Sequence, residues 1–168
     1  IVDMALEAIP AESTFWQCIS DVREWHKKYP SDWKATWFEV LKKWGVDTGC
    51  PKGVGLSFDI DAKLNSAYVT IGLLYGEGDF GKSMEIATRC GQDSDCNPAT
   101  VGGVLGVVYG LNNLPEFWKN PVMEIWDLDF EGTDVSLAKG SRYSFNHALK
   151  LIEKNGGEVR EDEVVIIS

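Results

Sequence analysis

The sequence is poor in histidine, with only His26 and His147. Two histidines leave little room for a Ser-His-Asp relay or for a histidine-rich metal site, and we interpret both as surface residues. Four cysteines in 168 residues are too sparse for a disulfide scaffold. Because they form no CxxC pair and show no zinc-ligand spacing, a structural zinc site is not expected either.

Long apolar runs and an excess of positive charge are also absent. No apolar run approaches the roughly 20 residues of a membrane-spanning helix, so no membrane partner is expected. Lys and Arg number 16 against 26 Asp and Glu, which gives a formal net charge of −10. Nucleic acid is not expected as a partner, because neutralising phosphates takes clustered basic side chains.

The first residues lack the pattern of a signal peptide, since no positively charged region precedes an apolar core there. Residues 1–9 instead read as an amphipathic helix that is already under way, and the chain starts with Ile1 rather than methionine. We therefore expect a cytoplasmic protein and a chain that is a piece of a longer one.

Helical patterns dominate the first two thirds of the sequence. Apolar residues recur at helical spacing, and Pro, Gly and capping residues separate the segments. We expect the region 46–63 to be a loop with a short extended piece at 56–58. The expected helices are residues 1–9, 14–29 with Ser13 as N-cap, 32–44 with Ser31 as N-cap, 66–75 with Asn65 as N-cap, 80–90 with Asp79 as N-cap, and a sixth from Asn97 onward.

The sixth helix has unusual chemistry. Asn97 as N-cap and Pro98 at the first helical position are preferred start residues. Three glycines follow within the helix, Gly102, Gly103 and Gly106. Since each internal glycine costs about 1 kcal/mol relative to alanine, we expect another backbone to approach closely along that face.

The pattern changes near residue 120. Residues 121–129 alternate apolar and polar side chains as a strand does. A last helix is predicted from a cap at Ser144 to residue 155, and residues 164–167 read as a strand. We expect two domains, 1–120 and a small α+β tail over 121–168.

The segment 91–98, GQDSDCNP, contains the residues best suited to binding a metal ion. Asp93 and Asp95 stand two residues apart in the turn that leads into a helix, and carboxylate oxygens are ligands that Mg²⁺ prefers. The alternative is that both aspartates serve the N-terminal end of the helix by capping its amides and facing its dipole. The spacing alone leaves both interpretations open.

Three segments together resemble the ADP-ribosylglycohydrolase family. They are YVTIGLLYGEGDF at 68–80, IATRCGQDSDC at 86–96 and GGVLG at 102–106, with NLPEFW at 113–118 as a fourth match. The order matches the family's helix, Gly-Asp-Phe-like turn, second helix, Gly-x-Asp-Thr-Asp-Thr metal motif and glycine-rich helix. The resemblance covers roughly residues 1–118.

The resemblance implies a mainly α fold, an orthogonal helical bundle that holds a pair of Mg²⁺ or Mn²⁺ ions. It implies a hydrolase that cleaves the N- or O-glycosidic bond between ADP-ribose and a protein or a small acceptor. Asp93, Asp95 and Cys96 match the family's metal-ligand positions, although the family most often has Thr or Ser at the third. A thiolate is a soft ligand that suits Mg²⁺ poorly, so either a water completes the site or another metal is used.

The resemblance also assigns roles to neighbouring residues. Gly91 and Gln92 are expected to shape the turn and, with Asn97, to bind substrate, although Asn97 is open to a role as ligand or as cap. The family's remaining ligands, a Thr/Ser-Asp-Asp cluster, come from an N-terminal half that this sequence does not contain. The expected partners are thus that missing half and an ADP-ribosylated protein or an ADP-ribose-containing small molecule, and we expect the chain alone to be inactive. Two alternatives are a non-catalytic relative that serves as a binding or structural module and a helical interaction domain whose Asp-x-Asp only caps.

Overall fold

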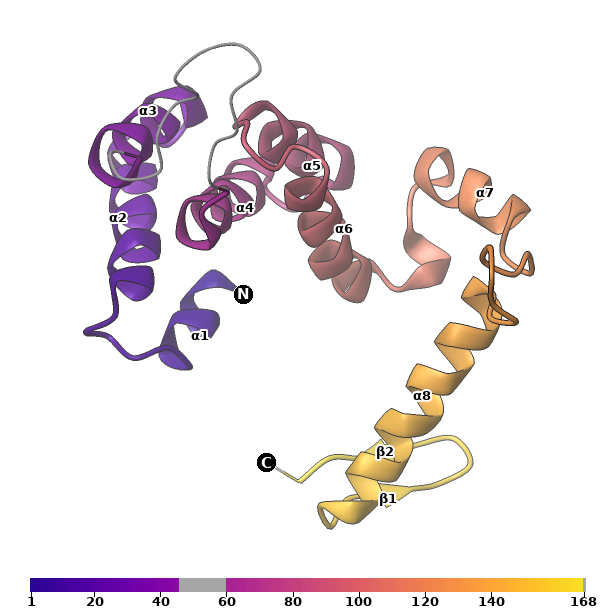
Figure 1. Ribbon diagram of the computed structural model, residues 1–168. Helices are drawn as coiled ribbons and strands as arrows, with labels where there is room; N and C mark the ends of the chain where they lie inside the picture. Colours follow the sequence, from indigo (N-terminus) through magenta and orange to yellow (C-terminus); the bar gives the residue numbers. More distant parts are fainter. Residues whose placement is uncertain (46–59, 168) are drawn as a thin grey trace. The chain divides into compact units, whose positions relative to one another are not determined.

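The computed structural model describes residues 1–45 and 60–167, so the extended piece expected at 56–58 lies outside the described residues. The chain divides into two compact units, residues 1–114 and 115–168 (Figure 1). The described residues are mainly helical with one small two-stranded sheet, which confirms the predicted fold class. The predicted domain boundary at residue 120 stays a prediction.

All regular elements among the described residues of the first unit are helices, which turns and loops connect. None of the helices that the structure describes, in either unit, combines the length and apolar character that crossing a bilayer requires. The elements of the first unit are α1 (Val2–Glu7), α2 (Thr14–Lys28), α3 (Trp33–Trp44), α4 (Ala62–Gly76), α5 (Phe80–Arg89), α6 (Cys96–Tyr109) and the 3₁₀ turn η1 (Leu111–Asn113).

Side-chain caps fix where these helices begin. Ser13 caps α2 and Asp79 caps α5, as predicted. The caps predicted for α3 and α4 are wrong by one and by four residues, and the cap predicted for α6 is wrong as well. Asp32 caps α3 in place of Ser31, and Asp61 caps α4 by accepting a hydrogen bond from the amide of Leu64 at 2.8 Å. Asn65 therefore lies inside α4, where its side chain is available for another purpose.

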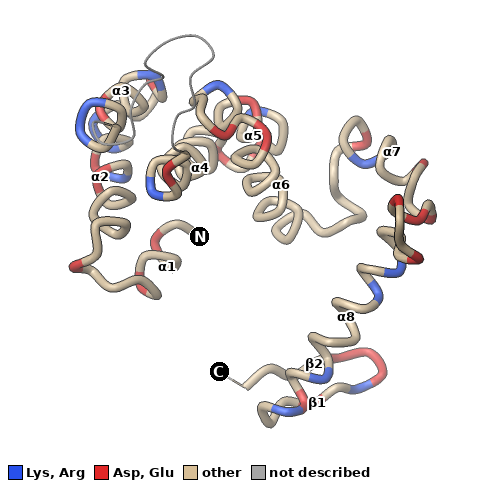
Figure 2. The backbone as a smooth tube through the Cα atoms, in the orientation of Figure 1, with Lys and Arg blue, Asp and Glu red and all other residues tan. Residues whose placement is uncertain are grey.

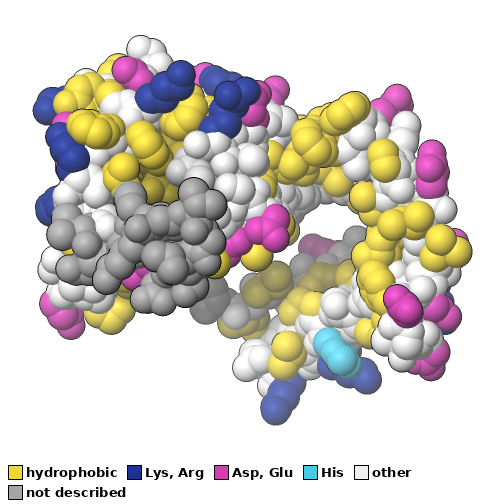
Figure 3. Space-filling model, turned by 45° about the horizontal axis from the view of Figure 1, so that its top comes forward, with side chains coloured by type: hydrophobic (Ala, Val, Ile, Leu, Met, Phe, Trp, Pro, Cys, Tyr) yellow, Lys and Arg dark blue, Asp and Glu magenta, His cyan; other side chains and the backbone are white. Residues whose placement is uncertain are grey.

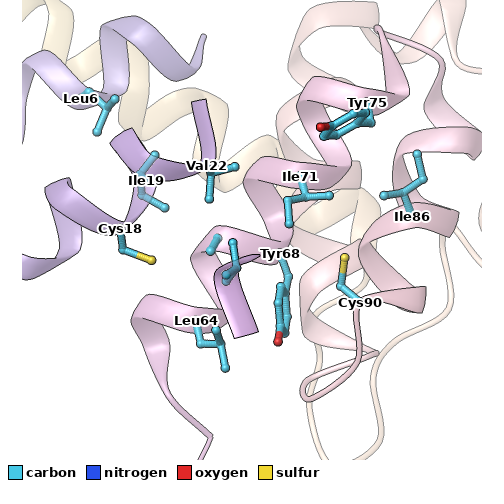
Figure 4. Close-up of a cluster of buried hydrophobic side chains, with 12 residues drawn as sticks. Leu6, Cys18, Ile19, Val22, Leu64, Tyr68, Ile71, Tyr75, Ile86 and Cys90 are labelled. Atoms are coloured by element: carbon cyan, nitrogen blue, oxygen red, sulfur yellow. The ribbon is translucent and has the colours of Figure 1, made fainter. Parts of the chain in front are cut away.

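Helix α4 is the centre of the first unit and contacts α2, α3, α5 and α6. Its buried face carries Leu64, Tyr68, Ile71 and Tyr75, which pack with apolar side chains from the neighbouring helices (Figure 4). The Tyr75 hydroxyl donates to the backbone oxygen of Tyr29 at 2.7 Å, so this buried polar group is satisfied. A segment that hydrogen-bonds to α4 is therefore anchored to the main hydrophobic core of the unit.

The close approach of two backbones occurs between α4 and α5. A Cβ atom added at Gly76 would lie 2.7 Å from the Cα of Ser83, and one added at Gly72 would lie 2.8 Å from the Ser83 carbonyl oxygen. By contrast, the described residues bring no other backbone close to the glycines of α6. A Cβ added at Gly102 would lie 3.2 Å from the Met84 side-chain sulfur, and one added at Gly103 or Gly106 would meet no described atom outside its own helical surroundings within 4 Å.

The second unit contains α7 (Glu116–Glu124), α8 (Leu137–Lys154), β1 (Glu158–Val159) and β2 (Val164–Val165), and β1 pairs with β2 in antiparallel fashion. The strand predicted over 121–129 is wrong, because residues 121–124 form the last turn of α7. Val122 and Trp126 are four residues apart, so the alternating pattern fits a helical turn as well. Helix α8 begins seven residues before the predicted cap, since Ser136 accepts from the amide of Lys139.

Candidate metal centre

Residues 91–95, here named the acidic loop, connect α5 to α6. Gly91 and Gln92 both have positive φ angles, +90° and +55°, a conformation that glycine adopts freely and that strains a residue with a side chain. Just before the loop, the indole Nε1 of Trp37 donates to the backbone oxygen of Cys90 at 2.8 Å. The chain therefore reverses sharply at a point that α3 holds in place.

The loop brings three potential ligand groups together. One ligand atom each from Asp93, Asp95 and Cys96 lies within 4.8 Å of the others. Asp93 is half-buried, whereas Asp95 and Cys96 are exposed. The three predicted metal-binding residues are thus neighbours in space as well as in sequence, and the surface remains open for a further ligand.

Asp95 lacks the usual N-cap hydrogen bond, although the amide of Cys96, the first residue of α6, faces its carboxylate. This residue occupies the N-cap position of α6, but its side chain makes no capping hydrogen bond. A capping side chain accepts from the amide of the second or third helical residue. Here the second amide, that of Asn97, donates to the Asp93 backbone oxygen at 3.0 Å, and the third residue is Pro98, which has no N–H.

The protonation states of Asp95 and Cys96 differ. A hydrogen bond shared with the Asp93 side chain lowers the pKa of Asp95, and the nearby backbone amides of Asp95 and Cys96 lower it further. Hydrogen bonding to Asp93 raises the pKa of the Cys96 thiol, and the negative charges of both aspartates add to that effect. Asp95 is therefore a carboxylate at neutral pH, and Cys96 remains a thiol.

The donor chemistry fits a hard divalent cation in part. Asp93 and Asp95 offer the carboxylate oxygens that Mg²⁺ and Mn²⁺ prefer. The Cys96 thiol does not fit, since it is both soft and protonated. Burial raises the pKa of Cys18 and of Cys90 to about 12, so these thiols stay protonated as well.

A polar network lies directly beneath the acidic loop, and two of its members are asparagines. The Asn65 side chain accepts from the Asp93 amide at 3.2 Å and from the Asn97 side chain at 2.9 Å. It donates to the Gln92 side-chain oxygen at 3.2 Å and to the backbone oxygen of Asp61 at 3.1 Å. Asn97 is buried inside α6, so its predicted role as N-cap is wrong.

The predicted substrate-binding residues are Gly91, Gln92 and Asn97, and that role stays a prediction. The side chains of Gln92 and Asn97 are engaged by Asn65, and the Asn97 side-chain nitrogen also lies 3.5 Å from the Gly91 oxygen. Sequence reasoning missed Asn65 as a site residue. The sequence signal for such a role is a polar side chain on the buried side of a core helix, although the same residue type also favours an N-cap.

A groove of about 520 Å³ borders the centre on the side of Asp93. Its walls are mainly apolar and come from α1, α2, α4 and α6, while Asn65, Asp93 and Asn97 form part of its polar lining. This size falls within the range of ligand sites, about 300–1,000 Å³. An apolar groove with a few convergent polar groups is typical of a binding site.

Comparison with known proteins identifies the family. The family model described as ADP-ribosylglycohydrolase matches residues 1–150. The chain belongs to the ADP-ribosylglycohydrolase family. The match confirms the resemblance and places the chain among the hydrolases of that family, with its mainly α fold. No curated protein and no solved structure matches the chain.

Membership also bears on the acidic loop. ADP-ribosylglycohydrolases generally use divalent metals, and the group formed by Asp93, Asp95 and Cys96 is one that could hold such an ion. The family match extends from the first unit into α8 of the second. Residues 119–150, which follow the segments quoted from the sequence, are therefore covered by the family as well.

Proposed function

We propose that this chain contributes Asp93 and Asp95 to a dinuclear Mg²⁺ or Mn²⁺ site. The site belongs to a hydrolase that cleaves the N- or O-glycosidic bond between ADP-ribose and a protein or a small acceptor. One observation carries the proposal. The carboxylate of Asp95 makes no capping bond at the helix start, although it lies within 4.8 Å of a second carboxylate.

Such a metal pair, when bound, lowers the pKa of a bound water and stabilises charge as the glycosidic bond opens. The residues of this chain have simpler tasks. Asp93 and Asp95 hold the cation, and the half-buried position of Asp93 orients its carboxylate. The neighbouring groove takes part of the ADP-ribose group, since Asp93 belongs to both the groove and the acidic loop.

Further ligands come from another polypeptide segment in this proposal. Among the residues that the structure describes, Asp93, Asp95 and Cys96 form the group whose ligand atoms lie close enough together to hold one metal ion. Two carboxylates leave most coordination positions of a Mg²⁺ ion unfilled.

Apolar side chains also reach the surface, such as Val107, which is 87% exposed. Figure 3 shows apolar side chains interspersed with charged ones on one face of the molecule.

A second candidate is a non-catalytic relative that binds without hydrolysis. The observation in its favour is the Cys96 thiol, which stays protonated beside two aspartates and offers a hard cation no good ligand. In this case the groove would bind an ADP-ribose-containing molecule, and no product would form.

An assay for released ADP-ribose separates the candidates. The natural gene product that carries these residues is given proteins ADP-ribosylated on arginine or on serine, with Mg²⁺ or Mn²⁺ present. We expect release that stops when a chelator removes the metal. The 168-residue chain alone should release none, because it holds only part of the ligand set. Binding of ADP-ribose without any release would favour the non-catalytic relative.

The Cys96→Ser variant tests the third ligand position. A hydroxyl oxygen is a harder ligand than a thiol, and it can coordinate Mg²⁺ without losing its proton. We expect the Mg²⁺ dissociation constant to fall about threefold or more, measured by calorimetric titration of the chain. An unchanged constant would show that residue 96 does not contact the cation. Cys18→Ser, which alters a buried thiol away from the acidic loop, is the control for general effects of the exchange.

A further inference from the structure

Asn65 uses the full hydrogen-bonding capacity of its side chain. An amide group has two N–H donors and an oxygen that accepts two hydrogen bonds. All four are occupied, by the Asp61 backbone oxygen, the Gln92 side chain, the Asp93 amide and the Asn97 side chain. A buried amide in this state has a single orientation, because rotating it would break every one of these bonds.

Three of the four bonds join segments that are distant in the sequence. Asp61 and Asn65 belong to the start of α4, whereas the other three partners lie 27 to 32 residues later. Two of those partners, Gln92 and Asp93, belong to the acidic loop, and Asn97 lies in the first turn of α6. The loop is therefore fixed to the core helix at its beginning, at its middle and just beyond its end.

The strained part of the loop is held by the same side chain. Gln92 has a φ angle of +55°, a conformation that costs a non-glycine residue free energy and persists only where contacts enforce it. The bond from Asn65 to the Gln92 side chain is such a contact. The adjacent bond to the Asp93 amide sets the direction in which the next side chain, a predicted ligand, leaves the backbone.

We propose that Asn65 is the positioning residue of the metal centre, holding the acidic loop so that the carboxylates of Asp93 and Asp95 face one cation. The inference rests on the proposed function, because it assigns Asn65 its role through that metal site. Groups that orient metal ligands typically change metal affinity 10- to 100-fold when they are removed. Asn65 does not contact the cation and acts through the loop.

The test uses the 168-residue chain with Mn²⁺, whose free concentration is followed by electron paramagnetic resonance. We expect Asn65→Ala to raise the Mn²⁺ dissociation constant at least tenfold. Thr70→Val is the matched control, since it removes a buried hydrogen bond from the same helix, that to the Ser66 oxygen, and touches no loop residue. It should leave the constant within twofold.

The variant Asn65→Asp distinguishes a role in positioning the acidic loop from a role in the stability of the folded chain. Its carboxylate still accepts from the Asp93 amide and from Asn97, and the Gln92 amide can rotate to donate to it. We expect this variant to retain Mn²⁺ binding within threefold. Amide hydrogen exchange supplies a readout without metal. The Asp93 amide should be protected in the unaltered chain and in Asn65→Asp, and should exchange at least tenfold faster in Asn65→Ala.

Each outcome bears on one of the two proposals. Equal Mn²⁺ binding by the unaltered chain and by Asn65→Ala would overturn the positioning role and leave the metal site standing. Unprotected Asp93 in the unaltered chain would also overturn it. Absence of Mn²⁺ binding both to the unaltered chain and to the natural gene product, with Asp93 protected, would overturn the metal site and with it the role of Asn65. If Asn65→Ala does not fold, a loss of binding in Asn97→Ala decides the question, because that variant removes one partner of the same amide.

Discussion

Replacing Gly76 by alanine is expected to lower the free energy of unfolding by about 3 kcal/mol, at the upper end of the usual cost of overpacking. The added Cβ would lie 2.6 Å from the Cβ and 2.7 Å from the Cα of Ser83. The second of these atoms belongs to the backbone of α5, so a rotamer change cannot relieve the contact. Urea unfolding followed by circular dichroism measures the loss.

Two further variants make the result specific. Gly103→Ala places the same methyl group in α6 where a Cβ meets no described atom within 4 Å, and we expect it to stabilise the chain by up to about 1 kcal/mol. Ser83→Gly should recover part of the loss in Gly76→Ala, because it removes the side chain that the new methyl group meets. Equal effects of the Gly76 and Gly103 exchanges would contradict the close crossing of α4 and α5.

The contrast between these glycines shows what a sequence pattern can predict. Glycines three or four residues apart in a helix indicate a face without side chains, and that is true of both α4 and α6. They do not indicate whether another backbone uses the face. In α4 it does, through Gly72 and Gly76, whereas Gly103 of α6 is open over the described residues. Helix α6 carries no charged residue (Figure 2), and yet several of its residues are exposed.

Two helix starts followed from the sequence, whereas the equally local caps Asp32, Asp61 and Ser136 were not predicted. Ser13 and Asp79 stand directly before apolar residues at helical spacing, and their side chains need only the amide three residues ahead. Asn65 and Asn97 have the same capping chemistry but bond to each other. Such a bond depends on how two helices pack, which local propensity does not contain.

The candidate site was predicted in its acidic part and missed in its support. Asp93, Asp95 and Cys96 are close in sequence, so any turn brings them near each other, and the family resemblance pointed to them. Asn65 lies 28 residues before Asp93, and only the packing of α4 against the acidic loop reveals the contact. The strand predicted over 121–129 was wrong for another reason, since those few residues fit both a strand and a helical turn, whereas the later helix and strand of the tail have counterparts in α8 and β2.

The double variant Asp93→Asn, Asp95→Asn is expected to lose all stabilisation by divalent cations. A ligand that binds only the native state stabilises it by RT ln(1 + [L]/Kd), about 2.7 kcal/mol when free Mn²⁺ exceeds Kd a hundredfold. Asparagine keeps the shape of the side chain but removes the charge that a hard cation requires. Thermal unfolding with and without Mn²⁺ measures the effect, and in the natural gene product ADP-ribose release should fall at least about a hundredfold, since this is a loss of metal chemistry.

The chain supplies a matched control for this experiment in Asp127 and Asp129. These aspartates have the same spacing of two residues and are exposed, and among the described residues they are not part of a group that could hold a metal. Asp127→Asn, Asp129→Asn changes the net charge equally, although it also removes the ion pair of Asp129 with Lys139. Such an exposed pair contributes about 1 kcal/mol at most, with or without metal. The difference in Tm caused by Mn²⁺ should therefore survive in this control and vanish in the other variant. Loss of the difference in both would show that Mn²⁺ acts through general charge screening, and would remove the acidic loop as its binding site.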